Sequence, residues 1–227
     1  MKEKVSIIIP VYKPKMEIFD KLKRYLKKNA GAFEIIEIDG SAGLANTYNE
    51  GVKRAKGDIV ITLHQDCIPL ETNSIDKIIK PFREPNVVLA YSWIIDDESK
   101  EKYYCVYPDG KFIAYRKSAL EKVGMFDSQT FFTGGEDIDM WLKLKGIGKI
   151  AEVDTGIVHI HPGYFSNKTL EKRRQNGSIN GALFRVWGVK NPKWIRSLVM
   201  CLRHPNSYGI YFIRAFFSRK QNYRRIE

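Results

Sequence analysis

The chain has 227 residues, of which 44% are hydrophobic, 12% aromatic and 28% charged. This composition is typical of a folded globular protein with an ample hydrophobic core, and it excludes a disordered, collagen-like or disulfide-scaffold chain. Lys and Arg (38) outnumber Asp and Glu (26), so the net charge is +12. Such an excess predicts an anionic partner: nucleic acid, a phospholipid surface or a phosphorylated small molecule.

Strands and helices alternate in the first part of the chain. Short β-branched apolar runs predict buried strands over 5–9, 33–38 and 59–63. Apolar residues at helical spacing predict helices between these strands, over 18–26 and 45–55. This alternation predicts an α/β fold with a mostly parallel sheet flanked by helices, whose ligand binds beyond the carboxyl ends of the early strands.

The pattern is less regular after residue 70. A helix is expected over 75–82, then a strand over 87–93. An irregular stretch follows, and a second helix is expected to begin near Glu136. Two short strands are predicted near Ile150 and Ile157.

The positive charge is concentrated at the C-terminal end. Residues 1–167 hold 24 basic and 24 acidic side chains, whereas residues 168–227 hold 14 basic and 2 acidic. We therefore predict a charge-balanced main domain over 1–167 and a basic, aromatic-rich helical appendage over 168–227.

One aromatic face of this appendage has two interpretations. Flanked by arginines, it suits a helix lying on an anionic membrane surface, or it packs on the main domain and leaves a solvated basic face. The residues at helical spacing on this face are Tyr208, Tyr211, Phe212, Ala215 and Phe216.

The cysteines and the apolar segments indicate where in the cell the protein is found. Cys67, Cys105 and Cys201 are widely spaced and odd in number, which predicts neither a disulfide framework nor a structural zinc site. No run approaches the roughly 18 apolar residues of a membrane-spanning helix, and the first apolar stretch is too short for a signal peptide. We expect a cytoplasmic protein, either soluble or peripheral at the inner face of the cell membrane.

Polar residues follow the second and third predicted strands. Asp39 begins an Asp-Gly-Ser segment, where an acid can accept hydrogen bonds from a ribose or base, or can merely shape a turn. His64 and Asp66 follow the third strand. A carboxylate and an imidazole together suit Mg²⁺ or Mn²⁺, although a single Asp after a strand is often an ordinary loop residue.

Two later clusters carry further candidates. Glu136, Asp137 and Asp139 fall at the start of a predicted helix, where acids cap free N–H groups, but three acids exceed what capping requires. His159 and His161 share one face of an extended segment, which is a frequent metal-binding arrangement. The alternative is that one of these histidines is packed or hydrogen-bonded in the interior.

In their order along the chain, these segments resemble the inverting glycosyltransferases of family 2, which have the nucleotide-sugar-binding GT-A fold. The resemblance runs over about residues 3–165. It departs from the family at the first position of the DxD motif, where His64 replaces Asp and the sequence reads HQD. Some branches of the family are similar in carrying an HQD form. The matching segments are VSIIIPVYKP (5–14), FEIIEIDGS (33–41), GLANTYNEGVKRAKGDIVITLHQD (43–66), GKFIAYRKSALEKVGMFD (110–127) and GGEDIDMWLKLKGIGKI (134–150).

The resemblance implies roles for individual residues. Asp39 contacts the uracil or ribose of the donor, and Asp66 binds the metal as the second acid of DxD. Asp137 is the catalytic base, Glu136 and Asp139 crowd it and tend to raise its pKa, and Asp139 is the fallback base. The closing metal ligand is His161 or His159, with His161 preferred. Further donor contacts are expected at Pro10, Tyr12, Gly43, Asn49, His64 and Gln65.

The resemblance also implies an activity. A sugar is transferred with inversion from a nucleotide sugar, with UDP- or dTDP-sugars preferred, to a glycan or lipid-linked acceptor hydroxyl. A divalent Mn or Mg ion assists, and the pathway is surface glycan, polysaccharide or glycolipid synthesis. One alternative is a catalytically degenerate GT-A domain that binds nucleotide sugars or acts as a scaffold. The other is nucleic-acid binding, which is not expected because it leaves the acids at the strand ends unexplained.

Overall fold

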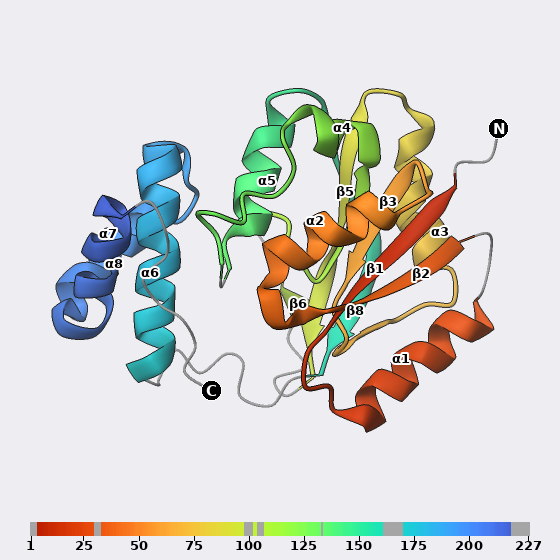
Figure 1. Ribbon diagram of the computed structural model, residues 1–227, viewed down its shortest axis with the longest axis horizontal. Coiled ribbons are helices and arrows are strands. Elements are labelled where there is room, and N and C mark those ends of the chain that lie inside the picture. Colours follow the sequence, from red (N-terminus) through yellow and green to blue (C-terminus); the bar gives the residue numbers. More distant parts are fainter. Residues whose placement is uncertain are drawn as a thin grey trace.

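The computed structural model describes residues 4–29, 33–97, 102–103, 107–132, 134–160 and 170–218. An eight-stranded sheet with helices on both faces forms the main part, and a separate group of C-terminal helices lies beside it (Figure 1). The predicted α/β fold is therefore confirmed. The strand order is β2-β1-β3-β7-β5-β8-β4, with the short β6 paired to β5.

The N-terminal strands form the predicted parallel unit. β1 pairs with β2 on one side and with β3 on the other, both in parallel. The connecting helices α1 and α2 provide the crossovers that parallel pairing requires. The bounds are β1 (Val5–Val11), α1 (Met16–Lys28), β2 (Phe33–Asp39), α2 (Leu44–Arg54) and β3 (Ile59–Leu63).

The second half of the sheet is mixed. β7 (Phe112–Arg116), which the sequence did not predict, lies antiparallel between β3 and β5 (Val87–Asp96). β8 (Lys149–His159) runs parallel to β5 as one strand, so the prediction of two short strands was wrong. Register shifts opposite β5 interrupt the apolar pattern of β8. β1, β2, β3, β5 and β8 therefore all point the same way, and their carboxyl ends lie at one edge.

The remaining elements of the main part are short. β4 (Cys67–Pro69) pairs antiparallel with the end of β8, and β6 (Lys102–Tyr103) pairs with β5. The helix predicted over 75–82 is α3 (Ser74–Ile79), continued by a 3₁₀ turn at Lys80–Arg83, because Pro81 cannot donate an α-helical hydrogen bond. The other helices are α4 (Lys117–Lys122) and α5 (Glu136–Lys145).

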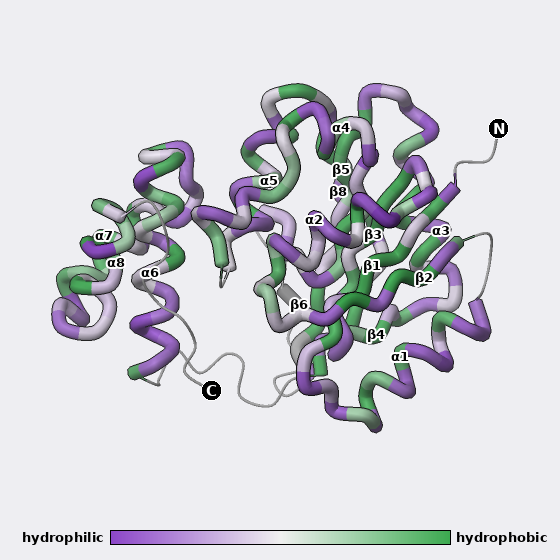
Figure 2. Tube along the Cα trace, viewed as in Figure 1, coloured by the Kyte–Doolittle hydropathy of each residue, from purple (hydrophilic) through white to green (hydrophobic). Residues whose placement is uncertain are grey.

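The hydrophobic core has one cluster on each face of the sheet. Ile7 and Ile9 of β1 pack with α1 and α3 on one face, while Ile8 packs with α2, α4 and α5 on the other. The central strands are accordingly hydrophobic along their length (Figure 2). Helices thus cover both faces of the sheet, as parallel strands require. This packing holds in place the strand ends where the candidate site lies.

In the described part of the C-terminal group the α-helices are α6 (Leu170–Trp187), α7 (Trp194–Arg203) and α8 (Ile210–Phe217), with a 3₁₀ turn at Gly188–Lys190 and a π-helical turn at Pro205–Gly209. The group joins the main part through a cluster in which Leu183 of α6 and Ala215 of α8 meet Phe131 and Ile138. No helix among the described residues is long and apolar enough to span a membrane.

The aromatic face predicted to meet either lipid or the main domain is mostly buried. Tyr208, Phe212 and Ala215 are 3%, 6% and 0% exposed. They lie mainly against α6, whose Phe184 contacts the Phe212 ring at a centroid distance of 5.8 Å. These residues are therefore inside the helical group and cannot form a lipid-facing surface.

Close contact between α6 and α8 depends on glycine. A Cβ at Gly181 would collide with the carbonyl oxygen of Phe212. We expect Gly181→Ala to lower the free energy of unfolding by about 1–3 kcal/mol, because the two backbones must separate. Urea unfolding would measure this, with Val186→Ala at a 42% exposed site of the same helix as control. Equal stability of the two variants would contradict the prediction.

Candidate active site

Polar side chains gather at the shared edge where β1, β2, β3 and β8 end. Gln65 joins the first and third of these strands: its Oε1 accepts from the Tyr12 N–H at 2.9 Å and its Nε2 donates to the Tyr12 carbonyl at 2.7 Å. Pro10 is buried in β1 opposite Ile38. The structure thus brings together the predicted residues of β1 and β3, with Gln65 holding the backbone in place.

Asp39 ends β2 with its side chain exposed. Its carboxylate accepts hydrogen bonds of 2.9 Å from both the N–H and the hydroxyl of Ser41, which lower the pKa of Asp39. The carboxylate is therefore ionised and shapes the turn, and it also lines an open pocket. The other residues of this pocket include Ser41, Asn46, Thr47, Glu50, Lys53 and Ser128.

The two residues predicted in the following loop and helix have mainly backbone roles. Gly43 has φ +85°, and a Cβ there would lie 2.7 Å from the carbonyl oxygen of Phe132. Asn49 uses both ends of its amide on the backbone of Phe126, at 2.8 and 2.9 Å. Asn49 also lines the pocket beside Asp39, and its contact with a donor stays a prediction.

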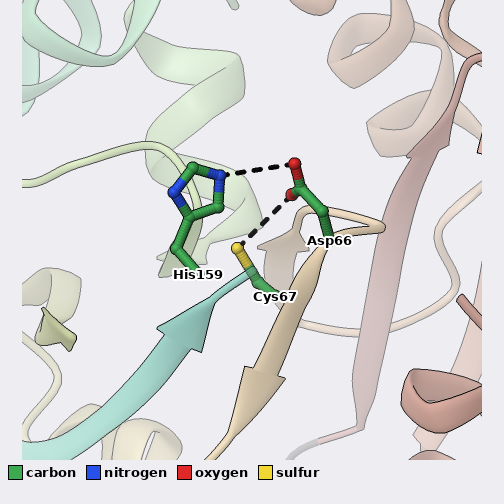
Figure 3. A group of neighbouring side chains, drawn as sticks. All are labelled: Asp66, Cys67 and His159. Atoms are coloured by element: carbon green, nitrogen blue, oxygen red, sulfur yellow. Dashed lines mark hydrogen bonds and ion pairs between the residues drawn. The ribbon is translucent and has the colours of Figure 1, made fainter. Parts of the chain in front are cut away.

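Asp66, Cys67 and His159 form a cluster where β4 pairs with the end of β8 (Figure 3). His159 Nε2 lies 3.3 Å from Asp66 Oδ2, and one potential ligand atom from each of the three residues lies within 4.8 Å of the others. The Asp66 side chain is 24% exposed, whereas that of His159 is 1% exposed. His161, the preferred metal ligand of the sequence analysis, lies outside the described residues.

In this cluster Asp66 is ionised and Cys67 is protonated. Although burial raises it, the pKa of Asp66 is held well below its usual value by the hydrogen bond from His159 and by the His64 and His159 rings. Burial raises the pKa of the Cys67 thiol well above its usual value, so the sulfur stays protonated. The atoms of this cluster best suited to ligate a hard cation are therefore a carboxylate oxygen of Asp66 and an imidazole nitrogen of His159.

His64, the residue that departs from the DxD pattern, has a specific partner. Its Nε2 shares a 2.8 Å hydrogen bond with the hydroxyl of Tyr48, a buried residue of α2. Burial lowers the pKa of His64 to about 4, so the ring is neutral near pH 7. The pairing of Tyr48 with His64 was not predicted, because helical spacing indicated only that Tyr48 lies on the inner face of α2.

The three acids of α5 differ in accessibility. Glu136 and Asp139 are 3% and 1% exposed, whereas Asp137 is only partly buried. Asp137 Oδ2 accepts from the Gly110 N–H at 3.1 Å, and Oδ1 accepts from the Ile138 N–H at 2.8 Å. Gly110 in turn has its carbonyl 3.4 Å from the Tyr48 hydroxyl, so one network links Asp137 to His64.

The pKa values of Glu136 and Asp137 are both raised. Burial and the neighbouring Asp137 carboxylate raise the pKa of Glu136 to about 8, and its Oε2 has no hydrogen-bond partner among the described residues. Burial and Asp109 also raise the pKa of Asp137, but Lys193 and the two N–H donors oppose this. Glu136, whose pKa is about 8, is therefore protonated near neutral pH.

Asp139 has a structural environment. Its Oδ1 accepts from the Trp187 indole at 2.9 Å, and its Oδ2 pairs with Lys143 at 2.7 Å. Although burial raises its pKa, these two partners oppose the shift. Asp139 thus ties α5 to α6.

Two groups at the site were missed by the sequence analysis. Asp109 and Lys111, just before β7, form an ion pair at 2.7 Å in which the lysine side chain is 4% exposed. Lys193, from the segment before α7, affects the pKa of Asp137 and lies 4.7 Å from the centre of the Tyr107 ring. No local pattern distinguishes these residues from ordinary surface charges, because Asp109 and Lys193 reach Asp137 only through the packing of distant segments.

Comparisons with solved structures agree with this fold. A mannosyltransferase from Pyrobaculum calidifontis, PcManGT, solved with GDP-Man and Mn²⁺, is 15% identical with a TM-score of 0.65, covering 96% of this chain and 76% of that one. The catalytic domain of Drosophila β1,4-galactosyltransferase 7, solved with xylobiose, is 15% identical with a TM-score of 0.55 over 72% and 73% of the two chains.

A third structure, GalNAc-T7 with UDP, GalNAc and Mn²⁺, is 14% identical with a TM-score of 0.53, over 93% of this chain and 56% of that one. At such identities these likenesses show a shared GT-A fold. No curated protein sequence matches the chain.

The family comparison is more specific. The model of glycosyl transferase family 2 matches residues 17–134, which is 118 of the 227 residues. This span runs from α1 to the glycines that precede α5, and it contains Asp39, His64 and Asp66. The chain therefore belongs to glycosyl transferase family 2 and is a glycosyltransferase.

Proposed function

We propose that this glycosyltransferase moves a sugar, with inversion, from a nucleotide sugar to an acceptor hydroxyl. The observation that carries the proposal is the convergence of three groups at one sheet edge: Asp39, the Asp66–His159 pair and Asp137. An exposed carboxylate for the nucleoside, a cation site for the diphosphate and a base for the acceptor are the three parts that such a displacement needs.

Asp66 and His159 would hold the divalent cation. Their carboxylate oxygen and imidazole nitrogen suit Mn²⁺ or Mg²⁺, whereas the protonated thiol of Cys67 is a poor ligand for these ions. The Mn²⁺ in the structures of PcManGT and GalNAc-T7 supports this choice of ion. When bound, a divalent ion stabilises the negative charge that develops on the leaving nucleoside diphosphate.

Asp137 accepts the proton of the attacking hydroxyl. Backbone N–H groups of Gly110 and Ile138 hold its carboxylate in a fixed orientation. Its raised pKa makes it a stronger base than an exposed Asp, while the protonated Glu136 beside it adds no second negative charge near neutral pH. Inversion follows because a carboxylate acting as base leaves one displacement, with no covalent sugar intermediate.

The donor is proposed to be a UDP- or dTDP-sugar and the acceptor a glycan or a lipid-linked hydroxyl. The structure of PcManGT contains GDP-Man and that of GalNAc-T7 contains UDP, so UDP, dTDP and GDP sugars should all be tested. A thermal-shift screen of UDP-, dTDP- and GDP-sugars with and without Mn²⁺ is the first experiment, followed by release of nucleoside diphosphate. Metal-dependent stabilisation with turnover supports the proposal, and stabilisation without any turnover would indicate a binding module instead.

Lys193 provides a test of the base through pH dependence. Its positive charge lowers the pKa of Asp137, so Lys193→Met is expected to raise that pKa. Since only the carboxylate form accepts a proton, the acid limb of the kcat/KM profile should move to higher pH. Lys190→Met, at an exposed site, is the control. An unmoved acid limb in Lys193→Met would contradict the assignment.

A further inference from the structure

The helix α7 turns its apolar side outward. Ile195, Leu198, Val199 and Leu202 recur at i, i+3, i+4 and i+7, so they form one stripe along the helix. This stripe is exposed, with Leu202 84% and Ile195 61% accessible. The fully buried residue of α7 is Ser197, which is the reverse of the pattern of a helix packed on a protein core.

α8 repeats this arrangement. Ile210, Ile213 and Phe217 share one side of the helix and are exposed, with Phe217 80% accessible. The opposite side, with Phe212 and Ala215, packs on α6. α7 likewise contacts α6 and the turn at Pro205–Gly209, so the inner sides of both helices are occupied within the C-terminal group. The outward residues, which we call the outer apolar face, are Ile195, Leu198, Val199, Leu202, Ile210, Ile213 and Phe217.

The charged residues of α7 and α8 have one sign. Between residues 172 and 226 the sequence contains no Asp or Glu. Arg196, Arg203 and Arg214 are exposed beside the apolar residues of α7 and α8. The guanidinium of Arg214 lies 5.8 Å from the centre of the Tyr211 ring. Long basic side chains that border an apolar face can reach a negatively charged headgroup layer while the face enters the acyl boundary.

This charge pattern selects among the occupants of such a face. A second copy of the chain would bring two strongly basic surfaces together, which like-charge repulsion disfavours. An anionic bilayer offers both a place for the apolar side chains and negative charge for the arginines. The C-terminal group also lies at one side of the molecule, away from α1 and β2, so a surface there is accessible to a bilayer (Figure 1).

We propose that the outer apolar face of α7 and α8 docks on anionic lipid, with both helices lying in the plane of the interface. The face differs from the aromatic side of α8 that the sequence suggested, because that side is buried on α6. Docking goes beyond the proposed function and does not depend on it. It would bring the enzyme to acceptors carried on lipid.

Vesicle flotation with the full-length protein tests the proposal. Vesicles of phosphatidylcholine and phosphatidylglycerol provide the anionic surface, and pure phosphatidylcholine vesicles the neutral one. The double variant Leu202→Glu/Phe217→Glu places charge on the two most exposed positions of the face, where no buried contact is lost. Met16→Glu, at a 53% exposed apolar site on α1, is the matched control.

The expected result is flotation of the wild type and of Met16→Glu with anionic vesicles, and weaker binding to neutral ones. The double variant should bind at least about tenfold more weakly while keeping the wild-type thermal melting curve. Absence of wild-type flotation, or equal flotation of the double variant, would overturn the proposal. A wild-type dimer that the double variant converts to monomer, without vesicle binding, would assign the face to a second copy. Since flotation requires no turnover, its outcome is separate from that of the transfer assays.

Discussion

Asp137→Asn is expected to lower the turnover of sugar transfer by about 10²–10⁴-fold, the usual contribution of a general base. The amide keeps the shape of the side chain but cannot take a proton from the acceptor. Binding of the nucleotide sugar should remain largely unchanged, because Asp137 is placed on the acceptor side of the proposed reaction. The measurement is kcat for release of nucleoside diphosphate, together with donor binding by calorimetry.

Two further acid-to-amide changes make this result specific. Glu121→Gln, at an exposed site of α4, should have no effect. Glu136→Gln should be much milder than Asp137→Asn near neutral pH, because an amide resembles the protonated acid that a pKa of about 8 implies. If Asp137→Asn retains wild-type turnover, or if Glu136→Gln is the more damaging change, Asp137 is not the base.

Asp66→Asn is expected to reduce metal-dependent transfer by at least about 100-fold, since it removes the charged member of the cation site. Unlike Asp137→Asn, it should also weaken donor binding in the presence of Mn²⁺. His159 alone then provides a single imidazole nitrogen, which is insufficient for a hard cation. A titration of Mn²⁺ against both donor affinity and turnover would separate this defect from a loss of the base.

Glu37→Gln provides the control for Asp66→Asn, because Glu37 is an exposed acid on β2. Chelation of the wild type with EDTA should reproduce the loss seen in Asp66→Asn. Equal donor affinity and turnover in the presence and absence of EDTA would show that Asp66 and His159 do not act through a metal.

The parts of the site that follow early strands were predictable, because parallel strands place their carboxyl ends at one edge. Asp39 and the segment from His64 to Asp66 are found there for this reason. The start of α5 was also predictable, since acids followed by apolar residues at helical spacing indicate a helix N-terminus. These inferences depend on local patterns and on one rule of sheet geometry.

Features that depend on distant contacts were not predictable. The run of β7 resembles other short apolar runs, and nothing local indicates that it inserts antiparallel between β3 and β5. The pairing of Tyr48 with His64 joins a helix to a strand end, and the effect of Lys193 on Asp137 joins the C-terminal group to α5. The sequence also left open which side of α8 is buried, and packing on α6 decides this, since the helix is apolar on both sides.

The proposed function requires one sheet edge to bind the nucleotide sugar through Asp39 and a divalent ion held by Asp66 and His159. A crystal structure of the protein with UDP and Mn²⁺, with the ion located by anomalous scattering, tests it most directly. We expect an anomalous peak bonded to the Asp66 carboxylate and the His159 ring, in contact with the diphosphate, with the nucleoside beside Asp39. An ion bound away from Asp66, or a nucleotide bound away from the ends of β1, β2 and β3, would contradict it.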